Sequence, residues 1–260
     1  SIVNFANCIT KHNFSNQGGG LFMSEGQPNI ENCHFESNRA TEKGGAVFIF
    51  FYTCSTKNSV FILNQAQEGG AFFNSLGSAA TFQLCKILGN KATDGGGGGL
   101  YNSSESNIQV LNSLITGNFS TKSGAAIRNN NTATIIGCTI SGNNCLDGLG
   151  GISNYGEKEL IVKNTIIYGN STGVSPIGNY QFCIIEGVNL YEPSVYVENP
   201  GFVNAPSYIY APFTNGNYHL NNCWPANNNG TTTDISELIT EFDLDRNARI
   251  LDGQIDIGVY

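Results

Sequence analysis

The chain has 260 residues, of which 12% are charged and 32 are glycine, and its formal net charge is −8. An acidic chain with 12 lysines and arginines argues against nucleic acid as a partner, because nucleic-acid binding needs a basic surface. No apolar run approaches the roughly 18 residues of a membrane span, so no membrane span is expected in this segment.

A repeat of 25 to 28 residues begins at the N-terminus and runs through most of the chain. One position of the repeat is asparagine in seven successive units: Asn13, Asn38, Asn64, Asn90, Asn118, Asn143 and Asn170. A steady period of this length is typical of a solenoid, in which each repeat forms one coil that stacks on the next. Because the repeat is already under way at Val3, we expect a fragment or mature portion of a longer polypeptide with flanking domains.

Within each coil, apolar and polar residues alternate, which indicates strands rather than helices. The alternation changes phase at a column that starts with Asn7, Asn32 and Asn58, and this predicts a corner with left-handed backbone. Small-residue tracts such as Gly44-Gly45-Ala46 predict another corner. Identical asparagines on successive coils are expected to hydrogen-bond along the axis as a structural ladder.

The predicted fold class is therefore all-β: a right-handed parallel β-helix of about seven to eight coils, with asparagine ladders and an irregular C-terminal cap. The coils are assigned to residues 1–187. Residues 188–260, where the period dissolves, are assigned to a capping segment of the same domain that covers the last coil. Within it, residues 234–242 are expected to form one short helix or a loop.

Most of the eight cysteines fall in columns of small or inward-facing residues. Cys8, Cys33, Cys85 and Cys138 share a column with serine and threonine, so they are expected to be reduced and to pack as small apolar residues. Cys8 and Cys33 lie on neighbouring coils, close enough for a disulfide, but their side chains are expected to point in parallel. Their redox state is left open by the sequence.

Four aromatic residues, Phe22, Phe48, Phe73 and Tyr101, each follow an inward aliphatic or aromatic residue in successive coils. Their column continues with Arg128 and Ser153, so it is expected to point outward. A stripe of four exposed rings predicts a binding surface for a cell-surface glycan or protein. The alternatives are an inverted parity or a loop at residues 50–53 that covers the stripe.

Catalysis receives little support from the sequence, and no catalytic residue is predicted. Hydrolases with this fold place paired carboxylates on neighbouring coils. Glu42 and Glu68 recur on adjacent coils just before glycine tracts, and they are expected to be a solvated bend. His12, His34 and His219 fall in different columns and predict no metal set.

The C-terminal segment carries motifs of its own. They are Asn199-Pro200-Gly201-Phe202-Val203, Tyr218-His219-Leu220, residues 243–250 and residues 255–260. These motifs resemble the end of the choice-of-anchor Q β-helix proteins. The repeats Phe35-Glu36-Ser37-Asn38 and Gly44-Gly45-Ala46-Val47 are similar to those of chlamydial polymorphic outer-membrane proteins. Gly201, Arg246 and Val259 depart from the usual residues of the first family, and its SPA-type stretch is barely visible at residues 223–226.

The resemblance implies a large surface protein, of a kind found in many Bacteroidota and exported by the type IX system. It implies a secreted or cell-surface location on the outer surface of a Gram-negative bacterium, and it implies no shared active site. The predicted function is an adhesin-like binding or structural module of such a protein. A polysaccharide lyase or glycoside hydrolase is the runner-up, and an inert structural stalk is the third candidate.

Calcium is the one cofactor that the sequence suggests. Asp243, Asp245 and Asn247 have the spacing of the first three ligands of a calcium loop, which Asp252 or Asp256 would complete. The simpler expectation is a turn in which Asp243 or Asp245 pairs with Arg249.

Overall fold

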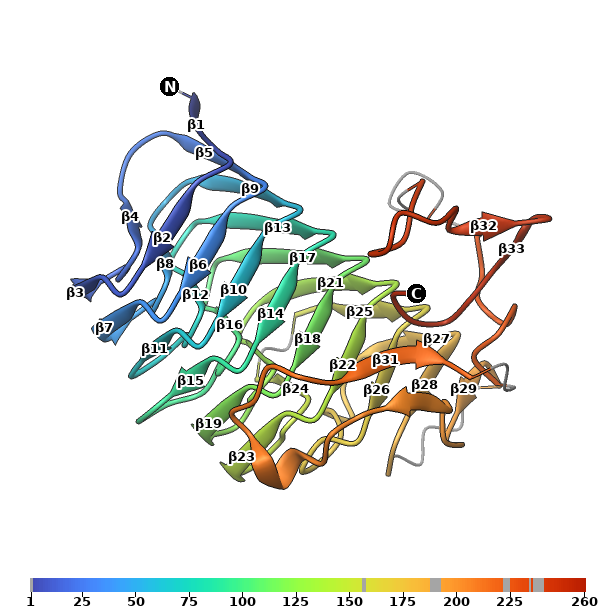
Figure 1. Ribbon diagram of the computed structural model, residues 1–260. Coiled ribbons are helices and arrows are strands. Elements are labelled where there is room, and N and C mark those ends of the chain that lie inside the picture. The colour runs from blue at the N-terminus through green and yellow to red at the C-terminus, as the bar shows by residue number, and fades with distance from the viewer. Residues whose placement is uncertain (1, 156–157, 188–192, 222–224, 234, 236–240) are drawn as a thin grey trace.

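Short strands of alternating polarity stack into a parallel β-solenoid in the computed structural model, which describes residues 2–155, 158–187, 193–221, 225–233, 235 and 241–260 (Figure 1). Each coil supplies strands to parallel sheets that we name A, B, C and D in chain order. Each strand pairs with its counterpart one coil away, for example Phe48 with Phe73. Among the described elements, helix is limited to the 3-10 turn η1 (Tyr208–Tyr210).

Sheets A and B are the longer pair. Sheet A has eight strands: β1 (Ile2–Ala6), β5 (Gln27–Glu31), β9 (Thr53–Lys57), β13 (Ala79–Gln83), β17 (Asn107–Leu111), β21 (Thr132–Ile136), β25 (Leu160–Lys163) and β27 (Asn179–Gln181). Sheet B has nine: β2 (Ile9–Lys11), β6 (His34–Glu36), β10 (Val60–Ile62), β14 (Lys86–Leu88), β18 (Leu114–Thr116), β22 (Thr139–Ser141), β26 (Ile166–Tyr168), β28 (Cys183–Ile185) and β29 (Val195–Tyr196).

Sheets C and D have six strands each. Sheet C contains β3 (Phe14–Gln17), β7 (Arg39–Lys43), β11 (Gln65–Ala66), β15 (Lys91–Ala92), β19 (Phe119–Lys122) and β23 (Asn144–Asp147). Sheet D contains β4 (Leu21–Met23), β8 (Val47–Ile49), β12 (Phe72–Asn74), β16 (Leu100–Asn102), β20 (Ile127–Asn129) and β24 (Ile152–Asn154). About six coils are therefore complete, slightly fewer than the seven to eight expected, because the described chain after Asn170 adds strands to sheets A and B and not to C and D.

Residues with positive φ turn the chain at several corners. One is the predicted glycine-tract corner between sheets C and D, where Gly44 and Gly69 have φ of 66° and 63°. The other predicted corner lies between sheets A and B, where Asn7, Asn32 and Leu84 have φ of 54°, 52° and 53°. A third column of this kind, between sheets B and C, was not predicted. It holds His12, Ser37 and Leu63 in the first coils and Gly89, Gly117, Gly142 and Gly169 in the later ones.

The asparagine column forms the expected ladder. In its middle, Asn90 Nδ2 donates to Asn118 Oδ1 at 3.0 Å and to the Phe61 carbonyl at 2.9 Å. Asn90 Oδ1 accepts from the backbone amide and Nδ2 of Asn64 at 2.9 and 3.0 Å. Side-chain bonds of the same kind join successive members from Asn13 to Asn170. The ladder thus pairs buried polar atoms that would otherwise lack partners.

A second asparagine ladder stands at the end of sheet D and was missed by the sequence analysis. Nδ2 of Asn74, Asn102 and Asn129 donates to the Oδ1 of the next member at 2.8, 2.7 and 2.7 Å, and the series ends at Asn154. The first two coils carry Met23 and Ile49 at this position, which obscures the column in the sequence.

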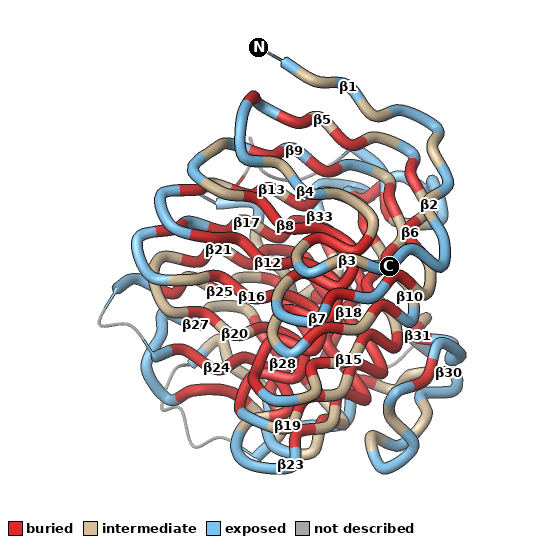
Figure 2. Tube along the Cα trace, turned by 90° about the vertical axis from the view of Figure 1, so that its left-hand side faces the viewer, coloured by how far each residue is buried: buried red, intermediate tan, exposed pale blue. Residues whose placement is uncertain are grey.

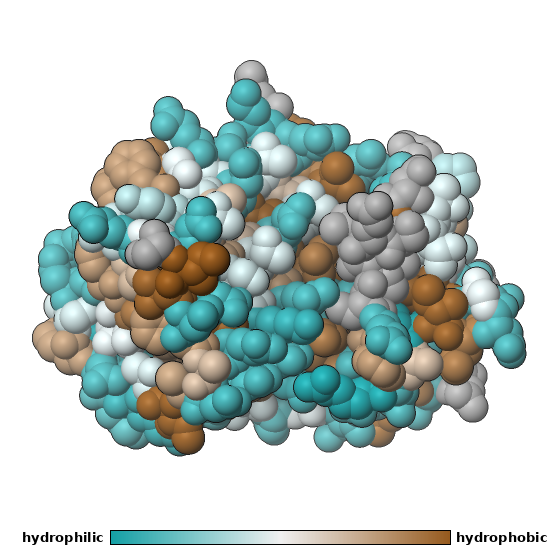
Figure 3. All heavy atoms as spheres, turned by 90° about the horizontal axis from the view of Figure 1, so that it is seen from above, coloured by the Kyte–Doolittle hydropathy of each residue, from teal (hydrophilic) through white to brown (hydrophobic). Residues whose placement is uncertain are grey.

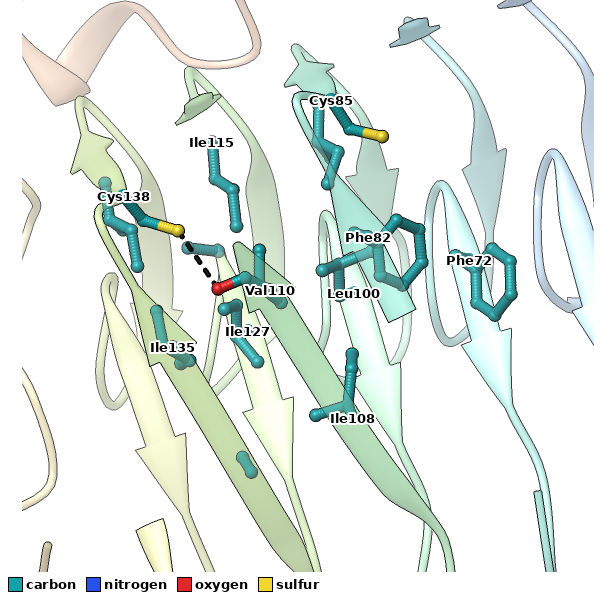
Figure 4. Close-up of a cluster of buried hydrophobic side chains, with 14 of the residues drawn as sticks. Phe72, Phe82, Cys85, Leu100, Ile108, Val110, Ile115, Ile127, Ile135 and Cys138 are labelled. Carbon is teal, nitrogen blue, oxygen red and sulfur yellow. Dashed lines mark hydrogen bonds between the residues drawn. The ribbon is translucent and has the colours of Figure 1, made fainter. Parts of the chain in front are cut away.

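Buried residues recur along the strands of successive coils, where they are red segments of the Cα trace (Figure 2). The close-up shows aliphatic residues, Phe72 and Phe82 stacked along the interior of the coils (Figure 4). Cys138 Sγ donates to the Val110 carbonyl at 3.3 Å, and the cysteines of the described residues are free thiols, including Cys8 and Cys33. Cys223 lies outside the described residues.

The described tail lies along the side of the solenoid and also contacts the last coil, where β29 pairs with β28. The assignment of residues 188–260 as a cap of the last coil stays a prediction. Strands β30 (Phe202–Asn204) and β31 (Asn217–Leu220) form an antiparallel hairpin across the outer face of sheet B (Figure 1). The Phe213 amide donates to the Gly117 carbonyl at 3.0 Å, and Tyr218 packs with Leu114 and Val259. A second small hairpin, β32 (Ile250–Leu251) and β33 (Gln254–Ile255), follows.

Outward apolar residues of sheet B explain this position of the tail. Ile166 and Ile184 point out of the coil and are buried against Ala226 and Ile257. The predicted boundary at 187/188 stays a prediction, since Val188 lies outside the described residues. Cys223 and Trp224 of the weak SPA-type match, and most of the possible helix at 234–242, also lie outside the described residues.

Candidate binding surface

The outer face of sheet D carries a continuous row of rings and one cation. Phe22, Phe48, Phe73, Tyr101 and Arg128 are in register on successive strands. The rings stack parallel to one another, with centroids 5.3, 5.6 and 4.5 Å apart from Phe22 to Tyr101. The buried members form a cluster separate from the interior core, so the column faces outward, as its variation to arginine predicted.

The exposure expected for this stripe is wrong for three of its four rings. Phe48, Phe73 and Tyr101 are only 5%, 2% and 8% exposed, whereas Phe22 is 47% exposed. Phe50 covers part of Phe48, with ring centroids 6.4 Å apart, which matches the alternative that residues 50–53 shield the stripe. The accessible parts of this face are therefore Phe22, at the end of the stack, and the groups that cover the other rings.

Cationic side chains cover the rest of the row. Lys43 Nζ lies 4.8 Å from the centroid of the Phe73 ring. The Arg128 guanidinium lies 5.4 Å from the ring of Tyr101 and 4.4 Å from that of Tyr155, which is 58% exposed. Burial raises the pKa of the Tyr101 phenol, and the negative charge of Glu68 raises it further. The row thus ends at Tyr155 in an accessible ring stacked on a cation.

A charged cleft lies beside this row, at the corner between sheets C and D. Its volume is about 430 Å³, and it is lined by Glu42, Lys43, Gln67, Glu68, Asp94 and Lys122. The Glu68 amide donates to the Glu42 carbonyl at 3.0 Å, and Glu68 is in register with Lys43, so the two acidic residues lie on adjacent coils but not in one column, contrary to the prediction from the sequence. Lys43 Nζ lies 3.8 Å from a Glu68 carboxylate oxygen. The cleft thus places hydrogen-bond donors and acceptors next to the aromatic row.

Hydrogen bonding fixes the ionisation of Glu42. Gln17 Nε2 donates to one carboxylate oxygen at 2.9 Å, and Asn16 Nδ2 donates to the other at 3.1 Å. These bonds, from Gln17 first and then Asn16, lower the pKa of the Glu42 carboxyl. A general acid of a glycoside hydrolase needs the opposite shift, because it must hold a proton near neutral pH. Glu42 is therefore suited to accepting hydrogen bonds from a ligand rather than to protonating one.

The predicted calcium segment forms a closed turn in the structure. Asp243 Oδ1 accepts from the amides of Asp245 and Asn247 at 2.8 and 2.9 Å, and Asp243 Oδ2 accepts from Asn247 Nδ2 at 3.1 Å. Asp245 contacts His219, while Arg249 donates to the carbonyls of Asp256 and Tyr260. Neither aspartate forms the ion pair with Arg249 that the simpler expectation proposed. Within the described ranges, no group of three His, Cys, Asp or Glu side chains is arranged to hold a metal ion.

Several residues of this surface were not predicted from the sequence. Gln67, Asp94 and Lys122 join the cleft because each precedes a glycine tract, the position at which Glu42 and Glu68 were noticed. Tyr155 comes from the loop after β24 and follows no column. The available signal was the position relative to the glycine tract, because every coil brings that position to the same corner.

Comparisons with known proteins assign the chain to no family. No family model matches the chain. The chain is 26% identical over 225 residues to a metabotropic glutamate receptor-like protein R of Dictyostelium discoideum. That match covers 82% of this chain and 14% of the relative, so the chain spans a small part of the relative's length. No solved structure matches. Among the described residues, none of the helices is long and apolar enough to span a membrane.

Proposed function

We propose that the chain is a β-solenoid module of a cell-surface or extracellular protein, and that it binds a glycan at the row on sheet D and the adjacent cleft. The observation that carries this proposal is the row itself, in which stacked rings and Arg128 continue over five neighbouring coils beside a cleft of charged and amide side chains. Accessible rings at its two ends, Phe22 and Tyr155, offer faces on which sugar rings stack.

The chemistry of the cleft suits hydroxylated ligands. Carboxylates such as Glu42 and Glu68 accept hydrogen bonds from sugar hydroxyls, and lysines such as Lys122 donate them. Coils about 4.8 Å apart each contribute a polar group to the cleft, so an extended polymer can contact several coils at once. The similarity to a receptor-like protein of Dictyostelium discoideum supports a surface location. The resemblance of the tail to choice-of-anchor Q proteins supports the same location.

The lowered pKa of the Glu42 carboxyl argues against a role as the general acid of a glycoside hydrolase. An inverting or retaining hydrolase requires one carboxyl whose pKa is raised. An inert stalk would not need an outward row of rings covered by cations. The proposal therefore treats the surface as a recognition site on a rigid scaffold.

A glycan array with the purified chain tests the proposal. Tyr155→Ala and Glu68→Gln are expected to weaken binding of any captured glycan by about fivefold or more, since each removes one exposed contact of the surface. Phe14→Ser is the matched control, because Phe14 is 66% exposed on sheet C and does not line the cleft. Binding that both variants retain, or an array without signal above background, would contradict the proposal. Phe48 and Phe73 are unsuitable targets because they are buried.

A further inference from the structure

A cavity remains where the tail passes the last coils. Its volume is about 320 Å³, and it lies between the tail segment 199–208 and the corner of sheets B and C at Ser141 and Gly169. Small-ligand sites range upward from roughly 300 Å³, so this cavity has room for a small molecule or a head group. It is separate from the cleft on sheets C and D and shares no lining residue with it.

The glycine column between sheets B and C explains why the cavity lies here. A Cβ atom on Gly89, Gly117 or Gly142 would lie within 3.0 Å of Phe213 atoms. Phe213 therefore packs directly against these glycines. A Cβ atom on Gly169 would meet a single described atom, Ser141 Oγ, at 3.4 Å. Phe213 thus fills the corner as far as Gly142, and the next coil is left as the wall of a cavity.

The lining combines aromatic rings with one negative charge. Tyr168, Phe202 and Tyr208 line the cavity, and Glu186 is the only charged residue among the described groups that line it. The Gly169 amide donates to Glu186 Oε2 at 2.7 Å, which holds the carboxylate at the wall. Burial, and then the charge of Glu186, raises the pKa of the Tyr168 phenol, so this ring stays a neutral hydrogen-bonding group next to the carboxylate. Asn199 and Ser207 add neutral polar groups at the tail side.

We propose that this cavity binds the ammonium group of a small organic cation, such as a quaternary ammonium head group. Aromatic rings attract an alkylammonium ion through their negative faces, and a single carboxylate balances its charge. An anion is disfavoured because no lysine or arginine is found among the described lining residues. A divalent metal is disfavoured because such ions require several anionic or carbonyl ligands, and the described lining offers one carboxylate.

Calorimetric titration of the whole chain with choline, and with its uncharged isostere 3,3-dimethylbutan-1-ol, tests this proposal. Choline is expected to bind about tenfold more tightly than the isostere, because only choline gains the carboxylate and the ring faces as a cation. Glu186→Gln keeps the shape of the side chain and is expected to remove most of that difference. Tyr208→Ala is expected to weaken choline binding by about fivefold.

The matched control is Tyr210→Ala, because Tyr210 lies in the same 3-10 turn, is 71% exposed and does not line the cavity. It should leave choline binding unchanged. Phosphatidylcholine vesicles that bind in a Glu186-dependent manner would identify a lipid head group as the source of the ammonium, whereas binding confined to free choline would identify a soluble cation. Equal affinity for choline and the isostere, absence of choline binding, or binding that survives both Glu186→Gln and Tyr208→Ala would overturn the proposal.

Discussion

The asparagine ladder can be tested by replacing Asn90, which is fully buried, with alanine. The substitution removes Asn90 Oδ1, which accepts from the backbone amide and from Nδ2 of Asn64. It also removes Asn90 Nδ2, which donates to the Phe61 carbonyl and to Asn118 Oδ1. Each buried polar group left unpaired costs about 1–3 kcal/mol. With two donors of Asn64 orphaned, the free energy of unfolding should fall by about 2–6 kcal/mol. Domains are stable by only about 5–15 kcal/mol, so the loss is large.

Asn13→Ala is the matched control at the open end of the same ladder. Asn13 is exposed, and its substitution removes only the bond from Asn13 Nδ2 to Asn38 Oδ1, because the backbone amide of residue 13 still donates to that oxygen. Its cost should be about 1 kcal/mol or less. Asn90→Asp adds a second comparison, since it keeps an acceptor for Asn64 but places a carboxylate against Asn118 Oδ1. It should be at least as destabilising as Asn90→Ala.

Urea unfolding followed by circular dichroism measures these differences. If Asn90→Ala and Asn13→Ala lower the free energy of unfolding by amounts within about 0.5 kcal/mol of each other, the side-chain ladder does not stabilise the fold in the way argued. Asparagine would then be needed at this column for its backbone preferences alone.

Burial raises the pKa of Cys54, Cys85, Cys138 and Cys183 from 9.0 to about 12. The neutral buried thiols therefore contribute fully to the free energy of unfolding below pH 9. That contribution is lost as pH rises from 9 to 12, by roughly 1.4 kcal/mol per thiol per pH unit. Alkaline unfolding of Cys138→Ala should be less steep with pH; an unchanged slope would contradict this. At pH 8 a thiol reagent should label Cys8 and leave those four intact, as peptide mass spectrometry would show. Arg249→Met should free the tail to limited proteolysis, because Arg249 is 5% exposed and bonds the carbonyls of Asp256 and Tyr260; unchanged cleavage would refute that role. Calcium should leave the melting temperature unchanged, since Asp243 already accepts three hydrogen bonds within its turn; a rise of several degrees would show that the ion binds.

The candidate surface could be predicted only in part from the sequence. The register of Phe22, Phe48, Phe73 and Tyr101 followed from the repeat, because equivalent positions of successive coils must stack. Their burial did not follow, because it depends on Phe50, Lys43 and Arg128 folding over the rings. The cavity at Gly169 could not be predicted from the repeat either, because one of its walls comes from the non-repetitive tail.

The sequence by itself determined the parallel solenoid, the corner at Asn7 and its equivalents, and the ladder through Asn90, because all three are repeated at one period and each repeat meets only its neighbours. The position of the tail was decided only by the tertiary structure. The change from Leu63 to Gly89 in the corner column between sheets B and C marks the first coil that Phe213 covers, but this contact joins residues far apart in the chain. A local pattern specifies stacking between coils, whereas the docking of a non-repetitive segment depends on which outward apolar residues, such as Leu114 and Ile166, need a partner.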